Sequence, residues 1–293
     1  MGRSSRGQYL IYIGVFIACI IIYLQFQPIE EGFEESPEPG TVHEDSTVPI
    51  KVFLYADKLK PTAKALLNSL KKHKYSYEVL GLGKPWEGWV ARTKEYLAAI
   101  QRYKGEKGGS AVALFIDAYD VLCIKDSDKF YKTYLERERN MPVIFGAEQN
   151  CHTEMCNKKI LEWYDMHTEE GKEGIMNHIN TWGESDEHLW ARDRPAFTNN
   201  GTIMGTADGL EFLFLEILNT GIQDDQVAAG HVTVANLDKF DIDYEEQLFR
   251  NRFRHLEKRG DENGRDGPAF LHFHAMKSEE EQADILQRYA SYE

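Results

Sequence analysis

Short apolar runs alternate with amphipathic stretches through the first half of this chain. Residues 50–55, 77–80 and 111–116 are largely apolar runs of the length typical of buried strands. Between them, apolar residues recur at helical spacing over residues 61–73 and 90–103. The order strand, helix, strand, helix, strand predicts a βαβαβ unit with parallel strands.

The alternation continues further along the chain. Residues 126–139 predict a helix, residues 142–146 another strand and residues 208–219 a later helix. We therefore expect an α/β fold with a mostly parallel sheet flanked by helices. Residues 158–195 mix many charges with Gly and Trp, and their pattern predicts no particular element.

A long apolar run lies near the amino terminus. It extends from Tyr9 to Phe26, and roughly 18 residues are about the minimum for a helix that crosses a bilayer. Basic residues precede the run and acidic residues follow it, which predicts a cytosolic tail at 1–8 and a single transmembrane signal anchor at 9–27. A cleaved signal peptide is the alternative, but no small-x-small site follows the apolar core.

The anchor predicts a type II, single-pass membrane protein. Residues 28–48 are rich in Glu, Pro, Ser and Gly, so we expect a disordered acidic stem there. The remaining residues, 49–293, are long enough for one folded domain, which would lie on the lumenal side of the endoplasmic reticulum or Golgi in a eukaryotic cell.

Charge and cysteine content exclude some functions. The net charge of -14 and the pI near 5.2 argue against a nucleic-acid groove, because phosphate binding needs clustered Lys and Arg. Cys151 and Cys156 are close enough in sequence to pair in an oxidising compartment, whereas Cys19 lies in the apolar run. A zinc site is disfavoured, because no second Cys or His pair at metal spacing accompanies them.

Two carboxylates follow the buried run at 111–116. Asp117 and Asp120 would project at the carboxyl end of a central strand, where open α/β sheets place their ligands. Carboxylate oxygens are hard ligands that suit Mn²⁺ or Mg²⁺. The alternative is structural, since Asp after a strand often caps a turn or a helix.

A histidine pair near the carboxyl end offers a further ligand. His272 and His274 would share one face of a strand, and imidazole is an acceptable ligand for Mn²⁺-type metals. Lys277 follows them and would neutralise a nearby phosphate group. Ordinary core or surface histidines are the alternative interpretation.

Two polar segments between these motifs are further site candidates. Asn199, Asn200 and Gly201 combine amides with a glycine that lets the backbone approach a ligand, although a plain turn is the alternative. The same segment contains a glycosylation sequon. Asp224 and Asp225 begin a predicted helix, where they would cap it or orient an acceptor hydroxyl.

The order of these motifs resembles the glycosyltransferase domain of the procollagen lysyl hydroxylases. That domain has kinship to the collagen galactosyltransferases and a GT-A-like (Rossmann-like) nucleotide-sugar fold, and the resemblance covers residues 50–277. The matching pieces are Val79-Leu-Gly-Leu-Gly, Trp86-Glu-Gly-Trp, Lys94, Leu114-Phe-Ile-Asp-Ala-Tyr-Asp-Val, Phe145-Gly-Ala-Glu, Asn199-Asn-Gly with Gly205, Asp224-Asp-Gln, and His272 near Lys277. The glycine-rich segment that the family has before its Lys is absent here.

The resemblance implies an Mn²⁺-dependent (or other divalent cation-dependent) transfer of a hexose, glucose or galactose, from a UDP-sugar to a hydroxyl. The acceptor would be a protein or glycan, with a hydroxylysine-type protein acceptor as one candidate. The residue roles that it implies are metal binding by Asp117, Asp120 and His272, with His274 the alternative; nucleotide contact by Leu80, Trp86, Lys94, Asp117, Tyr119 and Lys277; and catalytic roles on the acceptor side for Asp224, Asp225 and Asn200.

Two other classes compete with this interpretation. An aspartyl-phosphate phosphatase also begins at a strand end, but its two acids are one residue apart, whereas two residues separate Asp117 from Asp120. A membrane-tethered nucleotide-sugar or carbohydrate-binding protein without turnover would have the same pocket. UDP release from a panel of UDP-sugars separates an enzyme from a binding protein.

Overall fold

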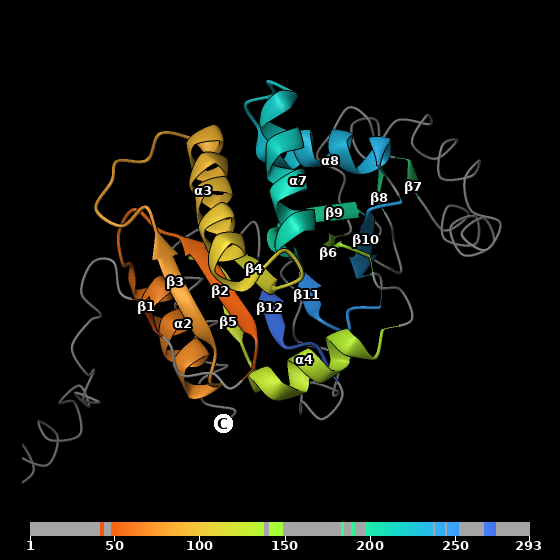
Figure 1. Ribbon diagram of the computed structural model, residues 1–293. Coiled ribbons are helices and arrows are strands. Elements are labelled where there is room, and N and C mark those ends of the chain that lie inside the picture. The colour runs from red at the N-terminus through yellow and green to blue at the C-terminus, as the bar shows by residue number, and fades with distance from the viewer. Residues whose placement is uncertain are drawn as a thin grey trace, which may run out of the picture. The chain divides into compact units, whose positions relative to one another are not determined.

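A seven-stranded sheet lies at the centre of the computed structural model (Figure 1). The structure describes residues 42–43, 48–137, 141–148, 183–184, 189–190, 197–236, 238–243, 245–251 and 267–273, all within the compact unit Glu38–Glu293. In spatial order the strands are β1 (Val42–His43), β3 (Ser76–Leu80), β2 (Ile50–Tyr55), β4 (Val112–Asp117), β9 (Phe197–Thr206), β6 (Val143–Glu148) and β10 (Phe240–Asp243).

The sheet is mixed rather than uniformly parallel. Strands β3, β2 and β4 are parallel, as are β6 and β10, while β9 lies antiparallel between β4 and β6. The βαβαβ start and the α/β class are confirmed. The predicted mostly parallel order holds for β3, β2, β4, β6 and β10, which run in one direction. The exceptions are β1, which is antiparallel to β3, and β9, which is antiparallel to both of its neighbours.

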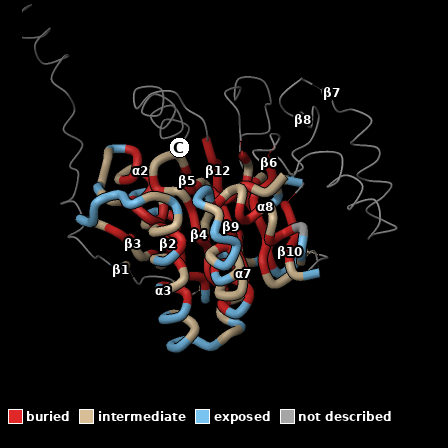
Figure 2. Tube along the Cα trace, turned by 90° about the horizontal axis from the view of Figure 1, so that it is seen from above, coloured by how far each residue is buried: buried red, intermediate tan, exposed pale blue. Residues whose placement is uncertain are grey.

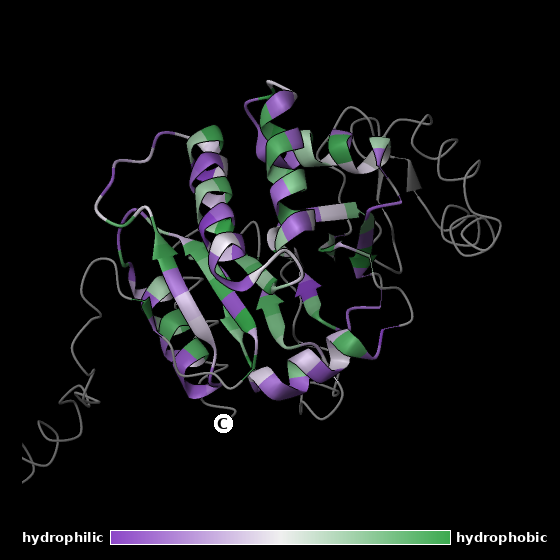
Figure 3. Cartoon of the chain, viewed as in Figure 1, coloured by the Kyte–Doolittle hydropathy of each residue, from purple (hydrophilic) through white to green (hydrophobic). Residues whose placement is uncertain are grey.

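Helices cover both faces of the sheet (Figure 1). They are α2 (Pro61–Lys72), α3 (Trp89–Lys107), α4 (Ser127–Leu135), α7 (Ala207–Asn219) and α8 (Asp225–Ala235). Alternate residues of β2 point to opposite faces: Val52 and Leu54 pack with α2 and α4, whereas Phe53 and Tyr55 pack with α3, α7 and α8. Figure 2 shows the buried strands between these layers, and Figure 3 shows that the central strands are mostly hydrophobic.

Most predicted elements occur, with shifted ends. The helix expected at 90–103 extends over Trp89–Lys107, because Gly108 at its C-cap has a positive φ that ends it. The helix expected at 126–139 is shorter and begins after Asp126 at its N-cap. In the stretch without a prediction, β7 (Gly183–Glu184) pairs with β8 (Leu189–Trp190).

The plain-turn interpretation of residues 198–205 is wrong. These residues belong to β9, and most of them are buried although their sequence is polar and glycine-rich. Gly205 is required by packing, because a Cβ there would lie 2.3 Å from the Pro142 carbonyl oxygen. A residue with any side chain at this position would push β9 away from β6.

A small second sheet follows the order β11 (Phe249–Asn251), β12 (Phe270–His272) and β5 (Val121–Cys123). Strand β12 is parallel to β11 and antiparallel to β5. It lies on the α2 and α4 side of the molecule, since Phe249 and Phe270 pack in the same core as those helices. This small sheet brings together three segments that are far apart in the sequence.

The predicted amino-terminal anchor at 9–27, the cytosolic tail at 1–8, and Cys19, Cys151 and Cys156 lie outside the described residues. Among the residues that the structure describes, none of the helices combines the length and apolarity needed to cross a membrane. The predicted stem, 28–48, includes one ordered stretch, because Val42–His43 pairs with β3 as an edge strand. The folded part therefore begins before the predicted boundary at residue 49.

Candidate active site

Asp117, Asp120 and His272 meet at one point although they are far apart in sequence. Asp117 ends β4, Asp120 directly precedes β5, and His272 ends β12. One ligand atom of each lies within 4.8 Å of the other two. The imidazole Nε2 lies 3.4 Å from Asp120 Oδ2 and 3.8 Å from Asp117 Oδ2. The structure thus brings together the residues predicted to hold a metal.

The register of the small sheet explains how His272 reaches the acids. His272 pairs with Val121, the residue after Asp120, and with Asn251 on the other side. The Phe273 amide also donates to the Asp120 carbonyl at 2.7 Å. Because these backbone bonds fix β12 against β5, they place the His272 imidazole next to Asp117 and Asp120.

Asn251 fixes the orientation of the His272 ring. Its amide nitrogen donates to the Ala147 carbonyl at 2.7 Å, so its Oδ1 faces His272 Nδ1, at 2.9 Å. A carbonyl oxygen can only accept, hence Nδ1 carries the hydrogen and Nε2 faces the carboxylates. There Nε2 either carries a proton that Asp120 accepts or offers its lone pair to a cation.

Gly201 provides the space for this ring. A Cβ on Gly201 would lie 2.1 Å from His272 Cε1, closer than real Cβ contacts. The sequence predicted that this glycine lets the backbone approach a ligand, whereas the group that it admits is an imidazole of the protein itself. The Asn-Asn-Gly segment is therefore part of the wall of the site.

The charges at this point are unfavourably concentrated. Burial raises the pKa of Asp117, the guanidinium of Arg92 opposes this, and the nearby Asp120 raises it further. For His272, burial lowers the pKa, but the two carboxylates outweigh it and the net shift is upward. Two acids and an imidazole arranged in this way fit a divalent cation, since a cation would relieve the repulsion between the carboxylates.

Arg92, which the sequence did not indicate, links two parts of the site. Its Nη1 donates to Asp117 Oδ1 at 2.6 Å, and its Nη2 donates to Asp225 Oδ2 at 2.6 Å. The Arg92 and Asp225 side chains are only 7% and 9% exposed. Arg92 shares the buried face of α3 with Tyr96 and Ala99, and an arginine among buried residues needs a partner, but only the structure shows this burial.

The paired acids Asp224 and Asp225 differ in their surroundings. Asp224 is exposed at the N-cap of α8, where Oδ1 accepts from the Val227 amide at 3.0 Å. Asp225 is buried and held by Arg92. Asn200 joins this end of α8 to β9, because its Nδ2 donates to the Asp225 carbonyl at 2.7 Å. The capping interpretation is therefore confirmed for Asp224, whereas Asp225 is held in a buried ion pair.

The predicted nucleotide contacts lie around the ends of β2, β3 and β4. Leu80 is buried at the end of β3, and Trp86 is 46% exposed in the loop that follows. The Tyr119 hydroxyl donates to Asp57 Oδ1 at 2.5 Å. Lys94 is exposed on α3, so Arg92 rather than Lys94 is the cation of this helix at the acid pair. His274 and Lys277 lie outside the described residues.

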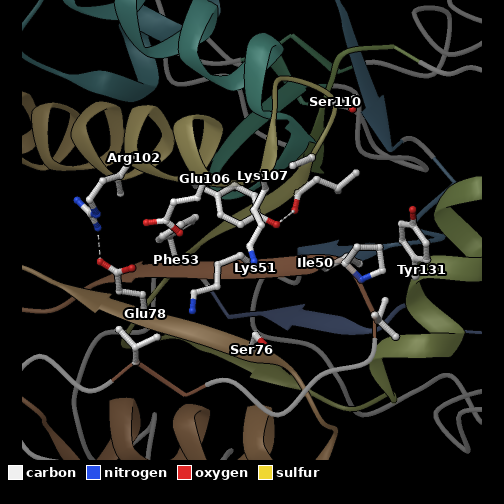
Figure 4. Close-up of a pocket in the computed structure, with 17 residues that line it drawn as sticks. Ile50, Lys51, Phe53, Ser76, Glu78, Arg102, Glu106, Lys107, Ser110 and Tyr131 are labelled. Atoms are coloured by element: carbon white, nitrogen blue, oxygen red, sulfur yellow. Dashed lines mark hydrogen bonds and ion pairs between the residues drawn. The ribbon is translucent and has the colours of Figure 1, made fainter.

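A hollow of about 960 Å³ lies at the opposite end of the strands, beside Ile50 and Val112 (Figure 4). Its polar lining is formed by surface charges of both signs, and Arg102 pairs there with Glu78. Asp117, Asp120 and His272 are not among its lining residues. The site is therefore assigned from its concentration of ligand atoms and not from the size of a cavity.

Comparison with known proteins supports the family resemblance of part of this chain. Residues 48–172 match the family model for the PLOD GT domain. A Caenorhabditis elegans protein, the multifunctional procollagen lysine hydroxylase and glycosyltransferase, is 32% identical over 96 residues, which are 30% of this chain and 13% of that protein. Residues 48–172 thus match a glycosyltransferase domain of the procollagen lysyl hydroxylase type, so the predicted resemblance is confirmed.

The solved structures that resemble this chain include two further proteins. One is a glycosyltransferase involved in the glycosylation of the major capsid of PBCV-1, with a TM-score of 0.48, 14% identity, and coverage of 82% of this chain and 98% of that one. The other is A197 from STIV, with a TM-score of 0.31, 11% identity, and coverage of 55% of this chain and 66% of that one.

Proposed function

We propose that this protein transfers a hexose from a UDP-sugar to a hydroxyl acceptor, with a divalent cation such as Mn²⁺ held by Asp117, Asp120 and His272. The observation that supports this most directly is the convergence of these three side chains, whose ligand atoms lie within 4.8 Å of one another. The match of residues 48–172 to the PLOD GT domain model supports a glycosyltransferase. The donor, the cation and the acceptor are the proposed additions.

The chemistry of the reaction explains the choice of residues. When the glycosidic bond to UDP breaks, negative charge grows on the leaving diphosphate, and a bound divalent cation would supply Lewis-acid stabilisation there. Asp117, Asp120 and His272 would hold that cation, and Asn251 orients the His272 ring. Lys277, close behind His272 in sequence, is proposed to add positive charge beside the diphosphate.

The acceptor side of the site is proposed to lie at the start of α8. Asp224 is exposed there and has an oxygen available to orient an acceptor hydroxyl, whereas Asp225 is occupied by Arg92. Asn200 holds this helix end against β9. The proposed acceptor is a protein or glycan hydroxyl, with that of hydroxylysine as one candidate. Leu80, Trp86 and Tyr119 remain the proposed border of the nucleotide.

The cellular setting is proposed from the amino-terminal sequence alone. The apolar run at 9–27, with basic residues before it and acidic residues after it, supports a signal anchor. The glycosyltransferase domain would then lie on the lumenal side of the membrane. Expression of the full chain in microsomes, followed by protease protection of the domain, tests this topology.

The experiment that tests the function measures UDP release from a panel of UDP-sugars, with Mn²⁺ or with a chelator. We expect turnover of at least one donor with Mn²⁺ and its loss with the chelator. Asp120→Asn should lose Mn²⁺-stimulated turnover, because it removes one ligand charge and leaves the shape unchanged. Asp128→Asn, which alters an exposed acid on α4, is the matched control and should retain it.

A protein that binds UDP-sugars without turning them over is the second candidate. It predicts calorimetric binding of UDP with Mn²⁺ but no UDP release from any donor, with or without an acceptor. Full activity of Asp120→Asn would contradict the metal role, and the absence of both binding and turnover in the wild type would contradict the proposed function as a whole.

A further inference from the structure

Two tryptophans whose rings are in contact are exposed at the start of α3. Trp86 and Trp89 are 46% and 44% exposed, and their rings meet edge to face with centroids 4.8 Å apart. The other large exposed hydrophobic residues of the described chain are Val42, Leu135 and Leu215. Exposed indoles in contact with each other form a sizeable apolar surface in water, and such surfaces mark binding sites.

The fold holds this pair in place. The Trp86 ring also meets Tyr55 at 5.6 Å, and a Cβ on Gly81 would lie 2.3 Å from the Tyr55 ring. Gly88, with a φ of 94°, turns the chain between the two tryptophans, and Trp89 is the first residue of α3. Because a helix end and a buried tyrosine position the indoles, their exposure is a property of the fold.

Arg92 connects the tryptophans to the reaction site. Its guanidinium carbon lies 4.5 Å from the centre of the Trp89 ring. The same guanidinium donates to Asp117 and to Asp225, at 2.6 Å each. One planar group therefore separates the Trp89 ring from both a proposed metal ligand and the start of α8, which is the proposed acceptor side.

We propose that Trp89, next to Trp86 at the proposed nucleotide border, is the wall of a hexose subsite and stacks against the apolar C–H face of a pyranose. The inference rests on the proposed function and names the residues that would recognise the sugar. A pyranose has an apolar face and a rim of hydroxyls, so it matches an indole beside carboxylates that accept hydrogen bonds.

The Arg92 guanidinium against Trp89 is already paired with Asp117 and Asp225, and the exposed charges that flank this wall include acidic ones. Glu87 lies exposed between the two tryptophans in sequence, and Asp224 is exposed at the start of α8. Glu95 near the same loop pairs with Lys84. Acidic neighbours repel a phosphate but accept hydrogen bonds from sugar hydroxyls, which leaves the diphosphate to the cation at Asp117 and Asp120.

The test compares ligands that differ by one sugar ring. Calorimetry with Mn²⁺ measures the Kd of UDP and of the UDP-hexose that wild-type protein turns over. A second titration adds free glucose or galactose to protein saturated with UDP and Mn²⁺, as a probe of an acceptor hexose. The variants are Trp89→Ala, Trp89→Phe, which retains a ring, and Leu135→Ala, a matched loss of an exposed apolar side chain elsewhere.

Covering about half of the exposed indole area with a sugar corresponds to roughly tenfold in Kd. For Trp89→Ala we expect this loss with UDP-hexose but a change of less than about twofold with UDP, if the wall holds the donor hexose. If it holds an acceptor hexose, the loss of roughly tenfold occurs in the free-hexose titration instead. Trp89→Phe should recover most of the affinity, and Leu135→Ala should match the wild type.

An equal loss for UDP and UDP-hexose would overturn the proposal, because Trp89 would then stack on the uracil base. Unchanged affinity in all three titrations would overturn it too. Both results leave the proposed function standing, since wild-type turnover is measured separately. Failure of the wild type to bind or turn over any UDP-hexose would reject the proposed function together with this inference. Circular dichroism confirms that each variant is folded.

Discussion

Removing Arg92 is the perturbation whose outcome depends most directly on the geometry of the site. Arg92→Ala leaves Asp117 and Asp225 without the cation that they share, and both the arginine and Asp225 are almost fully buried. Breaking a buried ion pair by removing one partner costs about 3–5 kcal/mol, because the remaining charge is desolvated and unpaired. A domain of ordinary stability, with an unfolding free energy of about 5–15 kcal/mol, would lose a large part of it.

A second arginine of the same helix provides the control. Arg102 pairs with Glu78, but its side chain is 53% exposed, and an exposed pair contributes at most about 1 kcal/mol. Arg102→Ala therefore removes the same side chain from the same helix without uncovering a buried charge. Arg92→Lys keeps the charge but loses the fork that reaches both acids, so its stability should lie between those of the wild type and Arg92→Ala.

Urea unfolding followed by tryptophan fluorescence measures the difference. We expect a lower midpoint for Arg92→Ala at an unchanged slope, and a larger recovery on adding Mn²⁺ than in the wild type, because the cation replaces charge lost beside Asp117. The reasoning is refuted if Arg92→Ala and Arg102→Ala are destabilised equally. A double variant, Arg92→Ala with Asp225→Ala, should be less destabilised than the sum of the two single changes.

Three further predictions concern residues around this site. Asn251→Leu should weaken Mn²⁺ binding in a calorimetric titration by about 10–100-fold, since the ring of His272 loses its orienting partner; unchanged affinity would count against the tautomer argument. Gly201→Ala should abolish Mn²⁺-stimulated turnover, whereas Gly105→Ala, where a Cβ meets nothing within 4 Å, should retain it and raise the urea midpoint. Cys123 is buried, and burial raises the pKa of its thiol. In a variant that keeps only this cysteine, we expect no reaction with a thiol reagent at pH 8 until the protein unfolds. Rapid labelling of the native protein would be inconsistent with the burial of Cys123.

The local hydrophobic pattern was sufficient to predict the strands and helices that bury one apolar face. Strands β2 and β4 and helices α2 and α7 occur close to their predicted positions, because their periodicity records which side meets the core. Strand β9 did not follow this rule. Its buried residues include the polar Asn199, Asn200 and Thr202. Because buried strands are usually apolar, this sequence predicts a turn although it forms a central strand.

Candidate chemistry was visible in sequence where the residue types are unusual for their position. Two aspartates at the end of an apolar run predicted a metal site, and the family resemblance supplied His272 as their partner. Arg92 was missed, because one basic residue on a helix with several others is ordinary until its burial is known. The differing surroundings of Asp224 and Asp225 were likewise invisible in a dipeptide of identical acids.

The sequence by itself determined the βαβαβ start, the acid pair at a strand end and the resemblance to a glycosyltransferase domain, since these depend on residue type and short-range spacing. Only the tertiary structure decided that β12 pairs with β5 and so delivers His272 to the acids, that Asn251 orients its ring, and that Arg92 joins Asp117 to Asp225. These contacts join residues far apart in the chain. Their geometry is set by strand pairing and packing of the whole domain, which no local pattern encodes.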